Sequence, residues 1–292
     1  EKVVKKLQKL VNVHPMFALW GLKEDNDAVR GEGCFDMVMQ KMDMLREAGV
    51  FFGASITATS KSCDEVTSDE FMKMLSDKGC LWSWFFHYVP VGDSPDVSLV
   101  PNAKQRQQIL KAVYNARNTL PMMTVDFWGD GPEMMGCIAG GRQYVHVNPN
   151  GDVEPCTFVH LATHNVKNCT LTEALAAPFM KAIRDGIPYE DGNMLRPCMI
   201  VDRPDVLRKY YQEFKPYETH ENAAAYLTDP KITSEIDKYS EEVKEILDED
   251  WRNNLWMTIF PLEGEYYVDR DNFCSKEKPK HKCSGHCAGC GK

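Results

Sequence analysis

Two cysteines flank a predicted β-hairpin and have the best spacing for chemistry in this chain. Cys137 precedes an apolar strand at residues 144–147, and Cys156 follows the return strand at residues 152–154. Asn-Pro-Asn-Gly at residues 148–151 predicts the turn, because Asn-Gly readily adopts positive φ. A hairpin returns its ends to the same place, so we expect the two thiols to lie close together. This arrangement suits ligands of a metal or iron–sulfur cluster; the alternative is two buried cysteines beside a surface hairpin.

The composition is that of an ordinary globular protein, and it argues against some classes of partner. The chain has 292 residues, of which 43% are hydrophobic and 26% are charged, with a net charge of −9. Nucleic-acid binding calls for a basic face, so we expect no nucleic-acid partner. Without a long apolar run or a signal peptide, we expect a cytoplasmic protein with no membrane span. Eleven cysteines, an odd number, favour metal or cluster ligation over a disulfide framework.

The elements that must position these cysteines alternate between strands and helices. Strand-like runs occur at residues 13–21, 50–57, 80–89 and 122–128, and helical spacing occurs at residues 35–48, 68–77 and 101–120. This alternation predicts βα units and a parallel sheet. Because three units are too few to close a barrel, and the chain does not begin with Met, we expect a fragment that lacks upstream sequence.

Outside these units, we predict a polar loop at residues 25–33. We also predict one helix at residues 171–184, another at residues 204–214, and polar helices within residues 219–249. Gly49, at the end of a predicted helix, is expected to adopt the left-handed conformation of a C-cap.

With the predicted elements in this sequence order, residues 13–198 resemble the second half of a radical S-adenosylmethionine (radical SAM) enzyme with a twitch or SPASM-like auxiliary segment. The motif Arg30-Gly-Glu-Gly-Cys-Phe-Asp36 with Leu45-Arg-Glu-Ala-Gly49 resembles the loop and helix after the family's fourth strand. Ser55-Ile-Thr-Ala-Thr59 resembles the fifth strand, and Tyr88-Val-Pro-Val-Gly92 resembles the end of the sixth.

The cysteines carry the second part of the resemblance. Cys137, Gly151 and Cys156 match the first element of SPASM segments, Cys-x9–15-Gly-x4-Cys. Arg196-Pro-Cys198 resembles the later cluster cysteine. The resemblance therefore implies an auxiliary [4Fe–4S] cluster at Cys137, Cys156 and Cys198. Cys169 is either a fourth ligand or a buried free thiol.

The resemblance implies an α/β fold in which a partial parallel (β/α) barrel of the radical SAM type, later strands only, precedes a small hairpin-containing cluster domain and C-terminal helices. The expected boundaries are 1–128 for the partial barrel, 129–215 for the twitch/SPASM-like segment, 216–270 for a helical extension and 271–292 for a Cys-rich tail. The implied activity is reductive cleavage of S-adenosylmethionine, after which the 5′-deoxyadenosyl radical abstracts hydrogen from an unidentified substrate. A reductase or ferredoxin-type protein would donate the electron.

The resemblance also implies contacts to S-adenosylmethionine from Arg30, Ser55, Thr57, Pro90 and Gly92. Arginine suits planar carboxylates, and the alternative for Arg30 is an exposed loop side chain. Ser55 and Thr57 could touch the ribose, or serve only as strand residues.

Four other residues are assigned no chemistry. We interpret Cys34, Cys63 and Cys80 as structural, since they show no ligand spacing. His87 lies on an aromatic strand, and we interpret it as a core histidine.

The family's Cys-x3-Cys-x2-Cys motif normally follows its first strand, but here Cys283, Cys287 and Cys290 form it at the far C-terminus. Three thiolates at this spacing can hold three irons of a [4Fe–4S] cluster. Three interpretations of this tail remain open. It is an auxiliary cluster or zinc site, a tail without metal, or a radical-generating site. In the first case Cys274, His281 and His286 would be additional ligands. The alternative function for the whole chain is a non-catalytic iron–sulfur or zinc-binding module for electron transfer or partner binding.

Overall fold

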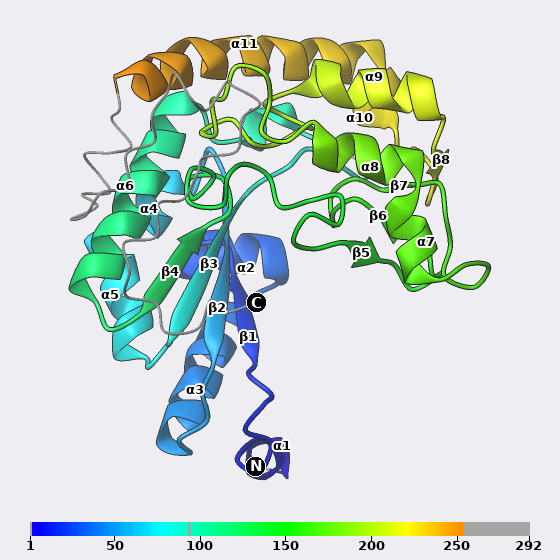
Figure 1. Cartoon of the computed structure of the whole chain (residues 1–292). Coiled ribbons are helices and arrows are strands. Elements are labelled where there is room, and N and C mark those ends of the chain that lie inside the picture. Colours follow the sequence, from blue (N-terminus) through cyan, green and yellow to red (C-terminus); the bar gives the residue numbers. More distant parts are fainter. Residues whose placement is uncertain (1, 93–94, 254–292) are drawn as a thin grey trace, which may run out of the picture.

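The computed structural model describes residues 2–92 and 95–253, and its first half is built on a parallel sheet (Figure 1). The strands are β1 (Met16–Leu19), β2 (Gly53–Ala58), β3 (Trp82–His87) and β4 (Met123–Asp126), in the spatial order β1-β2-β3-β4. All three pairings are parallel. This confirms the predicted α/β fold with a partial parallel (β/α) barrel.

Helices follow each of the first three strands. The main ones are α3 (Cys34–Glu47), α5 (Asp69–Asp77) and α6 (Ala103–Thr119), with α1 (Lys2–Leu7), α2 (Lys23–Arg30), α4 (Cys63–Val66) and the 3-10 turn η1 (Val97–Leu99) between or before them. Ser68 caps α5 by accepting a hydrogen bond from the Phe71 backbone N–H at 3.1 Å. Gly49 has φ +67°, as its predicted role after α3 requires.

The two faces of the sheet differ in burial. Leu19, Ile56 and Phe85 stand side by side in the strand register and are fully buried in the core shared with α3, α5 and α6. On the opposite face, Ala18, Ser55 and Trp84 form the neighbouring row and remain partly exposed. The sheet therefore has one helix-covered face and one open face, as a partial barrel requires.

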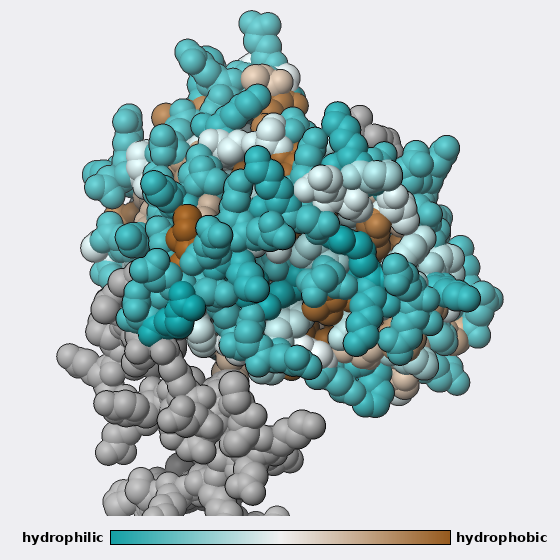
Figure 2. All heavy atoms as spheres, turned by 90° about the horizontal axis from the view of Figure 1, so that it is seen from above, coloured by the Kyte–Doolittle hydropathy of each residue, from teal (hydrophilic) through white to brown (hydrophobic). Residues whose placement is uncertain are grey.

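The second half of the chain forms a lobe of short strands and helices around the hairpin. Its elements are β5 (His146–Val147), β6 (Val153–Glu154), β7 (Leu161–Ala162), α7 (Leu171–Ala176), α8 (Pro178–Asp185), α9 (Pro204–Phe214), β8 (Tyr217–Glu218), α10 (Ala225–Thr228) and α11 (Pro230–Arg252). The long helix α11 runs along the top of the molecule, over both α6 and α9 (Figure 1). The upper face of the molecule, on which α11 lies, is covered mainly by hydrophilic side chains (Figure 2).

One hydrophobic core joins the two halves. Leu110 of α6, Val159 and Leu161 near the hairpin, and Val243 of α11 belong to the same buried cluster. Each of these side chains is at most 7% exposed. The hairpin lobe is thus packed against the barrel half through continuous apolar contacts.

Two local predictions were wrong. Residues 25–30 are helical rather than a loop, because α2 covers Lys23–Arg30, and only residues 31–33 form the predicted loop. Glu24 and Asp25 in the first turn of α2 and Arg30 in its last turn interact favourably with the helix dipole. Residues 171–184 form two helices, since Pro178 lacks a backbone N–H and restricts the residue before it. The structure confirms the predicted helix at residues 204–214 as α9.

Among the described residues, each helix is too short or too polar to traverse a bilayer.

Candidate auxiliary metal centre

The predicted hairpin is present, and side chains fix its turn. Strands β5 and β6 are antiparallel, with His146 opposite Glu154 and Val147 opposite Val153. The Asn148 Oδ1 accepts hydrogen bonds from the backbone N–H groups of Asn150 at 2.9 Å and Asp152 at 3.1 Å. Gly151 has φ +91°, a conformation that suits glycine. The hairpin therefore returns the chain toward Cys137, as the sequence indicates.

The thiols of Cys137, Cys156 and Cys198 pack against the same hydrophobic core and are not in disulfides. Burial, and then the neighbouring Cys156, raises the pKa of the Cys137 thiol to about 12. Burial also raises the pKa of Cys156 and Cys198, and Cys137 adds to the effect on Cys198. Cys137 thus interacts electrostatically with both other cysteines.

Three tyrosines each interact electrostatically with two of these cysteines. Burial is the main cause of the raised pKa of each phenol, and the cysteines add to it. Tyr144 interacts with Cys156 and Cys137, Tyr189 with Cys137 and Cys198, and Tyr226 with Cys156 and Cys198. Each tyrosine interacts with a different pair of cysteines, and all three cysteines pack against the same core, which indicates that the thiols lie in one region of the lobe.

The donor set suits an iron–sulfur cluster, although the thiols do not form a ready-made site. Within residues 2–92 and 95–253, no three His, Cys, Asp or Glu side chains are gathered closely enough to hold a metal ion as they stand. Thiols are nevertheless the usual ligands of such clusters, and the Phe158 N–H already donates to the Cys156 Sγ at 3.4 Å. Because the thiols are protonated at neutral pH, binding of a cluster would release their protons.

The fourth ligand suggested by the sequence lies in a different setting. Cys169 is half-buried, and its Sγ donates to the Asn165 carbonyl at 3.4 Å. It interacts electrostatically with Tyr217. The tail residues Cys274, His281, Cys283, His286, Cys287 and Cys290 lie outside the described residues.

A buried carboxylate anchors the hairpin. Glu154 is 1% exposed, and its oxygens lie 2.6 Å from His146 Nδ1, 2.6 Å from the Thr219 hydroxyl and 3.1 Å from the Asn148 amide nitrogen. His160 Nδ1 is 3.7 Å away. Although burial opposes ionisation, the hydrogen bonds from these side chains lower the pKa of Glu154 to about 2. No local sequence pattern indicates this anchor, because Thr219 is remote from Glu154 along the chain.

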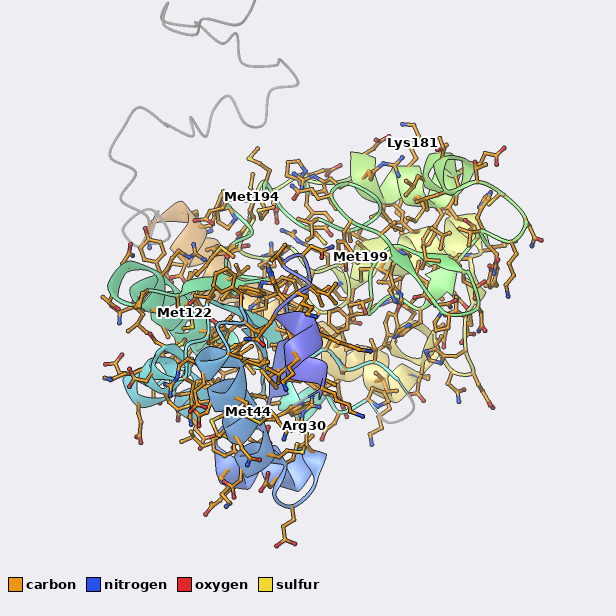
Figure 3. All side chains as sticks on the ribbon, turned by 90° about the horizontal axis from the view of Figure 1, so that it is seen from below. Arg30, Met44, Met122, Lys181, Met194 and Met199 are labelled. Carbon is orange, nitrogen blue, oxygen red and sulfur yellow. The ribbon has the colours of Figure 1, made fainter. Side chains whose placement is uncertain are left out.

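The residues proposed to contact S-adenosylmethionine lie in the barrel half. Ser55 and Thr57 are half-buried on the open face of β2, and Pro90 and Gly92 follow the end of β3. Arg30 is exposed at the end of α2, and Figure 3 shows it well separated from Met194 and Met199 in the cysteine-bearing part of the chain.

An aromatic group on the open face extends from the barrel to the hairpin. In the register, Trp84 is beside Ser55 and Phe86 is beside Thr57. Phe86 stacks on Phe127 with ring centroids 4.2 Å apart, and Trp84 meets Phe127 edge-on at 5.8 Å. Phe158, two residues after Cys156, contacts Phe86 at 6.4 Å. No local sequence pattern indicates this group, because its members come from three segments.

The structural interpretations of single residues agree with their burial. His87 is 3% exposed, lies 3.1 Å from Asp126 and stacks on Trp128 with centroids 4.9 Å apart, so it is a core histidine. Cys63 and Cys80 are buried, and burial raises the pKa of both to about 12. Cys34 is half-buried at the start of α3.

No protein-family model matches the chain. Among curated proteins, an AdoMet-dependent heme synthase of Nitratidesulfovibrio vulgaris is 25% identical over 174 residues, covering 51% of this chain and 47% of the relative. The mycofactocin maturase MftC of Mycolicibacterium smegmatis is 31% identical over 145 residues, covering 46% of this chain and 36% of the relative. The chain therefore spans about half the length, or less, of these relatives.

Two solved structures share the fold at low identity. Native anSMEcpe with bound AdoMet and a peptide superposes with a TM-score of 0.52 at 14% identity, over 81% of this chain and 73% of that one. SuiB of Streptococcus suis gives a TM-score of 0.51 at 16% identity, over 63% of this chain and 48% of that one. The curated relatives thus support kinship with the radical SAM superfamily, and the two solved structures show a shared fold.

Proposed function

We propose that this chain is part of a radical SAM enzyme that reductively cleaves S-adenosylmethionine and uses the 5′-deoxyadenosyl radical to abstract hydrogen from a substrate. The names of the heme synthase relative and of the AdoMet-bound anSMEcpe structure support S-adenosylmethionine as co-substrate. The cleavage consumes one electron, for which we propose a reductase or ferredoxin-type donor.

Within this proposal, Cys137, Cys156 and Cys198 ligate an auxiliary [4Fe–4S] cluster in a twitch/SPASM-like segment at residues 129–215. The observation that carries it is that the three cysteines pack against one hydrophobic core, where Tyr144, Tyr189 and Tyr226 each interact electrostatically with a different pair of them. When bound, the cluster would supply a redox centre beside the barrel. The protein's own contribution is to exclude water through the apolar core and to offer N–H donors to the sulfurs.

The barrel half, residues 1–128 in this division, would bind S-adenosylmethionine. Ser55 and Thr57 point to the open face, and Pro90 and Gly92 stand at the carboxyl end of β3, the end of a parallel sheet where ligands bind. The aromatic group formed by Trp84, Phe86 and Phe127 lies beside them. Residues 216–270 would form a helical extension, and residues 271–292 a tail that binds a cluster, zinc or nothing.

Anaerobic reconstitution with iron and sulfide tests the ligand assignment. The tail cysteines Cys283, Cys287 and Cys290 are first replaced by Ser, so that any remaining iron reports on the hairpin region. In this background we expect about four irons and four sulfides per chain. Adding C137S, C156S or C198S should abolish or sharply lower this content.

C34S is the matched control, since Cys34 is half-buried far along the chain from the hairpin. It should leave the iron content unchanged. Iron that survives the combined C137S/C156S/C198S replacement would overturn the assignment. The activity itself is tested by 5′-deoxyadenosine formation with dithionite in protein made from the complete gene, and its absence there would refute the enzyme proposal.

A further inference from the structure

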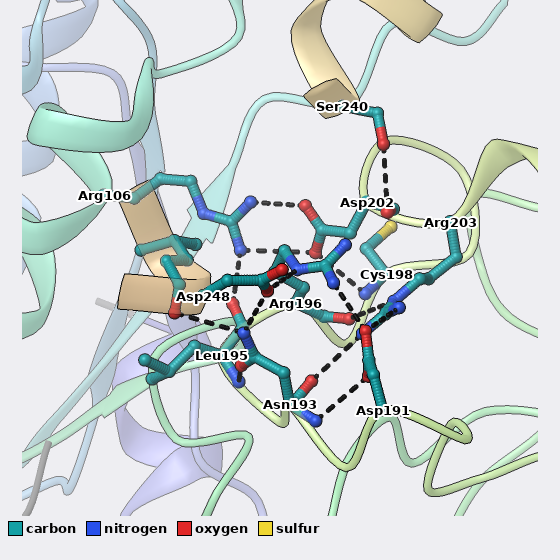
Figure 4. A network of polar contacts seen from close by, with 11 residues as sticks. Arg106, Asp191, Asn193, Leu195, Arg196, Cys198, Asp202, Arg203, Ser240 and Asp248 are labelled. Carbon is teal, nitrogen blue, oxygen red and sulfur yellow. Dashed lines mark hydrogen bonds and ion pairs between the residues drawn. The ribbon is translucent and has the colours of Figure 1, made fainter. Parts of the chain in front are cut away.

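A buried ion pair connects the loop that carries Cys198 to barrel helix α6. Arg106 and Asp202 are 4% and 1% exposed, and the guanidinium donates to both carboxylate oxygens (Figure 4). The Arg106 Nη2 also donates to the Leu195 carbonyl at 2.9 Å. One side chain of α6 therefore holds the loop at two points on either side of Cys198.

Asp202 passes this anchorage directly to the cysteine backbone. The Asp202 Oδ2 atom accepts a hydrogen bond from Arg106 Nη2 at 3.2 Å and another from the Cys198 backbone N–H at 3.0 Å. In return, the N–H groups of Asp202 and Arg203 donate to the Cys198 carbonyl at 2.9 and 3.1 Å. Both polar groups of the Cys198 backbone are thus fixed by the turn that Asp202 closes.

Further charged contacts limit the movement of the same loop. Arg196 is 2% exposed, and its guanidinium pairs with Asp191 at 2.6 Å and with Asp248 of α11 at 2.9 Å. The Ser240 hydroxyl of α11 donates to the Asp202 carbonyl at 3.1 Å. The loop is therefore attached to α6 on one side and to α11 on the other.

We infer that Asp202 is a positioning residue that fixes the Cys198 thiol relative to Cys137 and Cys156, and that Arg106 balances the charge of its buried carboxylate. A buried ion pair adds little net stability over well-packed apolar side chains, so stability alone does not account for it. Its distinguishing feature is that the paired carboxylate also accepts the backbone N–H of Cys198. The role in cluster binding rests on the proposed function, whereas the positioning of the thiol does not.

Two double variants separate positioning from charge burial. R106M/D202N and R106M/D202L both remove the ion pair without leaving an unpaired buried charge, but only the D202N replacement keeps an acceptor for the Cys198 N–H. The rate of Cys198 alkylation in cluster-free protein, measured by peptide mass spectrometry relative to Cys137 and Cys156, is the first readout. We expect the Cys198 alkylation rate of R106M/D202N to stay within about 2-fold of that of the original protein. The rate of R106M/D202L should be about 10-fold faster, a change that the loss of one hydrogen bond can produce.

I236A is the control for general destabilisation, because Ile236 is fully buried in the same core on α11. It should lower the melting temperature without changing the relative alkylation of Cys198. Equal Cys198 rates in the two double variants, or an equal change in I236A, would overturn the inference.

The electron paramagnetic resonance spectrum of the reduced, reconstituted protein is the second readout. It should keep its line shape in R106M/D202N and change in R106M/D202L; an unchanged line shape in both would contradict a role toward the cluster. Iron retained after replacement of all three cysteines would instead refute the ligand assignment while leaving the alkylation result standing.

Discussion

Replacing Glu154 with Gln tests whether one buried carboxylate holds the cysteine-bearing hairpin in shape. Gln keeps the size of the side chain but removes the negative charge that His146, Thr219 and Asn148 surround. Because Glu154 is 1% exposed, solvent screens these contacts little. The perturbation is therefore electrostatic rather than steric.

The lowered pKa gives the size and the pH dependence of the effect. A fall from the ordinary value of 4.5 to about 2 corresponds to about 3 kcal/mol of folding free energy. Since the folded state depresses this pKa, the contribution is complete above pH 4.5 and is lost as the pH falls toward 2. The E154Q variant should thus be less stable by about 3 kcal/mol at pH 7 and by roughly half as much near pH 3.

Urea unfolding of both proteins at pH 7, 5 and 3 measures this difference. E241Q is the matched control, because Glu241 is exposed on α11 and its replacement should change stability by less than about 0.5 kcal/mol at each pH. A stability difference for E154Q that is below about 0.5 kcal/mol, or that does not shrink with falling pH, would refute the reasoning.

Two further predictions concern the surroundings of the cysteines. A Cβ at Gly131 would lie 2.1 Å from the Met194 backbone carbonyl, so G131A should destabilise the protein by several kcal/mol in thermal unfolding. The loss of stability should exceed that in the control variant G33A, because a Cβ at Gly33 meets nothing within 4 Å and only the positive φ opposes the substitution. An unchanged melting temperature in G131A would contradict the close contact. The Cys137 thiol, with a pKa of about 12, should be alkylated about 10-fold faster for each unit of pH from 8 to 11 in cluster-free protein. A rate that levels off near pH 9 would show that its pKa is not raised.

The sequence predicted the parts of the fold that short-range patterns determine. The four parallel strands follow from apolar runs, α9 follows from its helical spacing, and Gly151 marks the hairpin turn that the structure confirms. The helix at Lys23–Arg30 was missed because it has few apolar residues, and its place is fixed by Asn26, a buried polar side chain that accepts the Trp20 N–H.

The surroundings of the site could not be predicted, because they depend on contacts between distant segments. Arg106 meets Asp202 across 96 residues, and Thr219 meets Glu154 across 65. Neither pair has a local pattern that links its members. The same holds for Tyr189 and Tyr226, whose electrostatic interactions with the thiols have no counterpart in a local sequence pattern.

The attachment of the Cys198 loop to α11 has a consequence for the order in which this region is completed during synthesis. Arg196 leaves the ribosome well before Asp248, one of the two carboxylates that pair with its buried guanidinium. Until α11 has been made, the loop lacks one of its two attachments, and Cys198 has not reached its final place. A cluster bound through this cysteine would therefore be inserted after translation of α11, and a chain that ended before residue 248 would contain the cysteines and the loop but lack the attachment of Arg196 to Asp248.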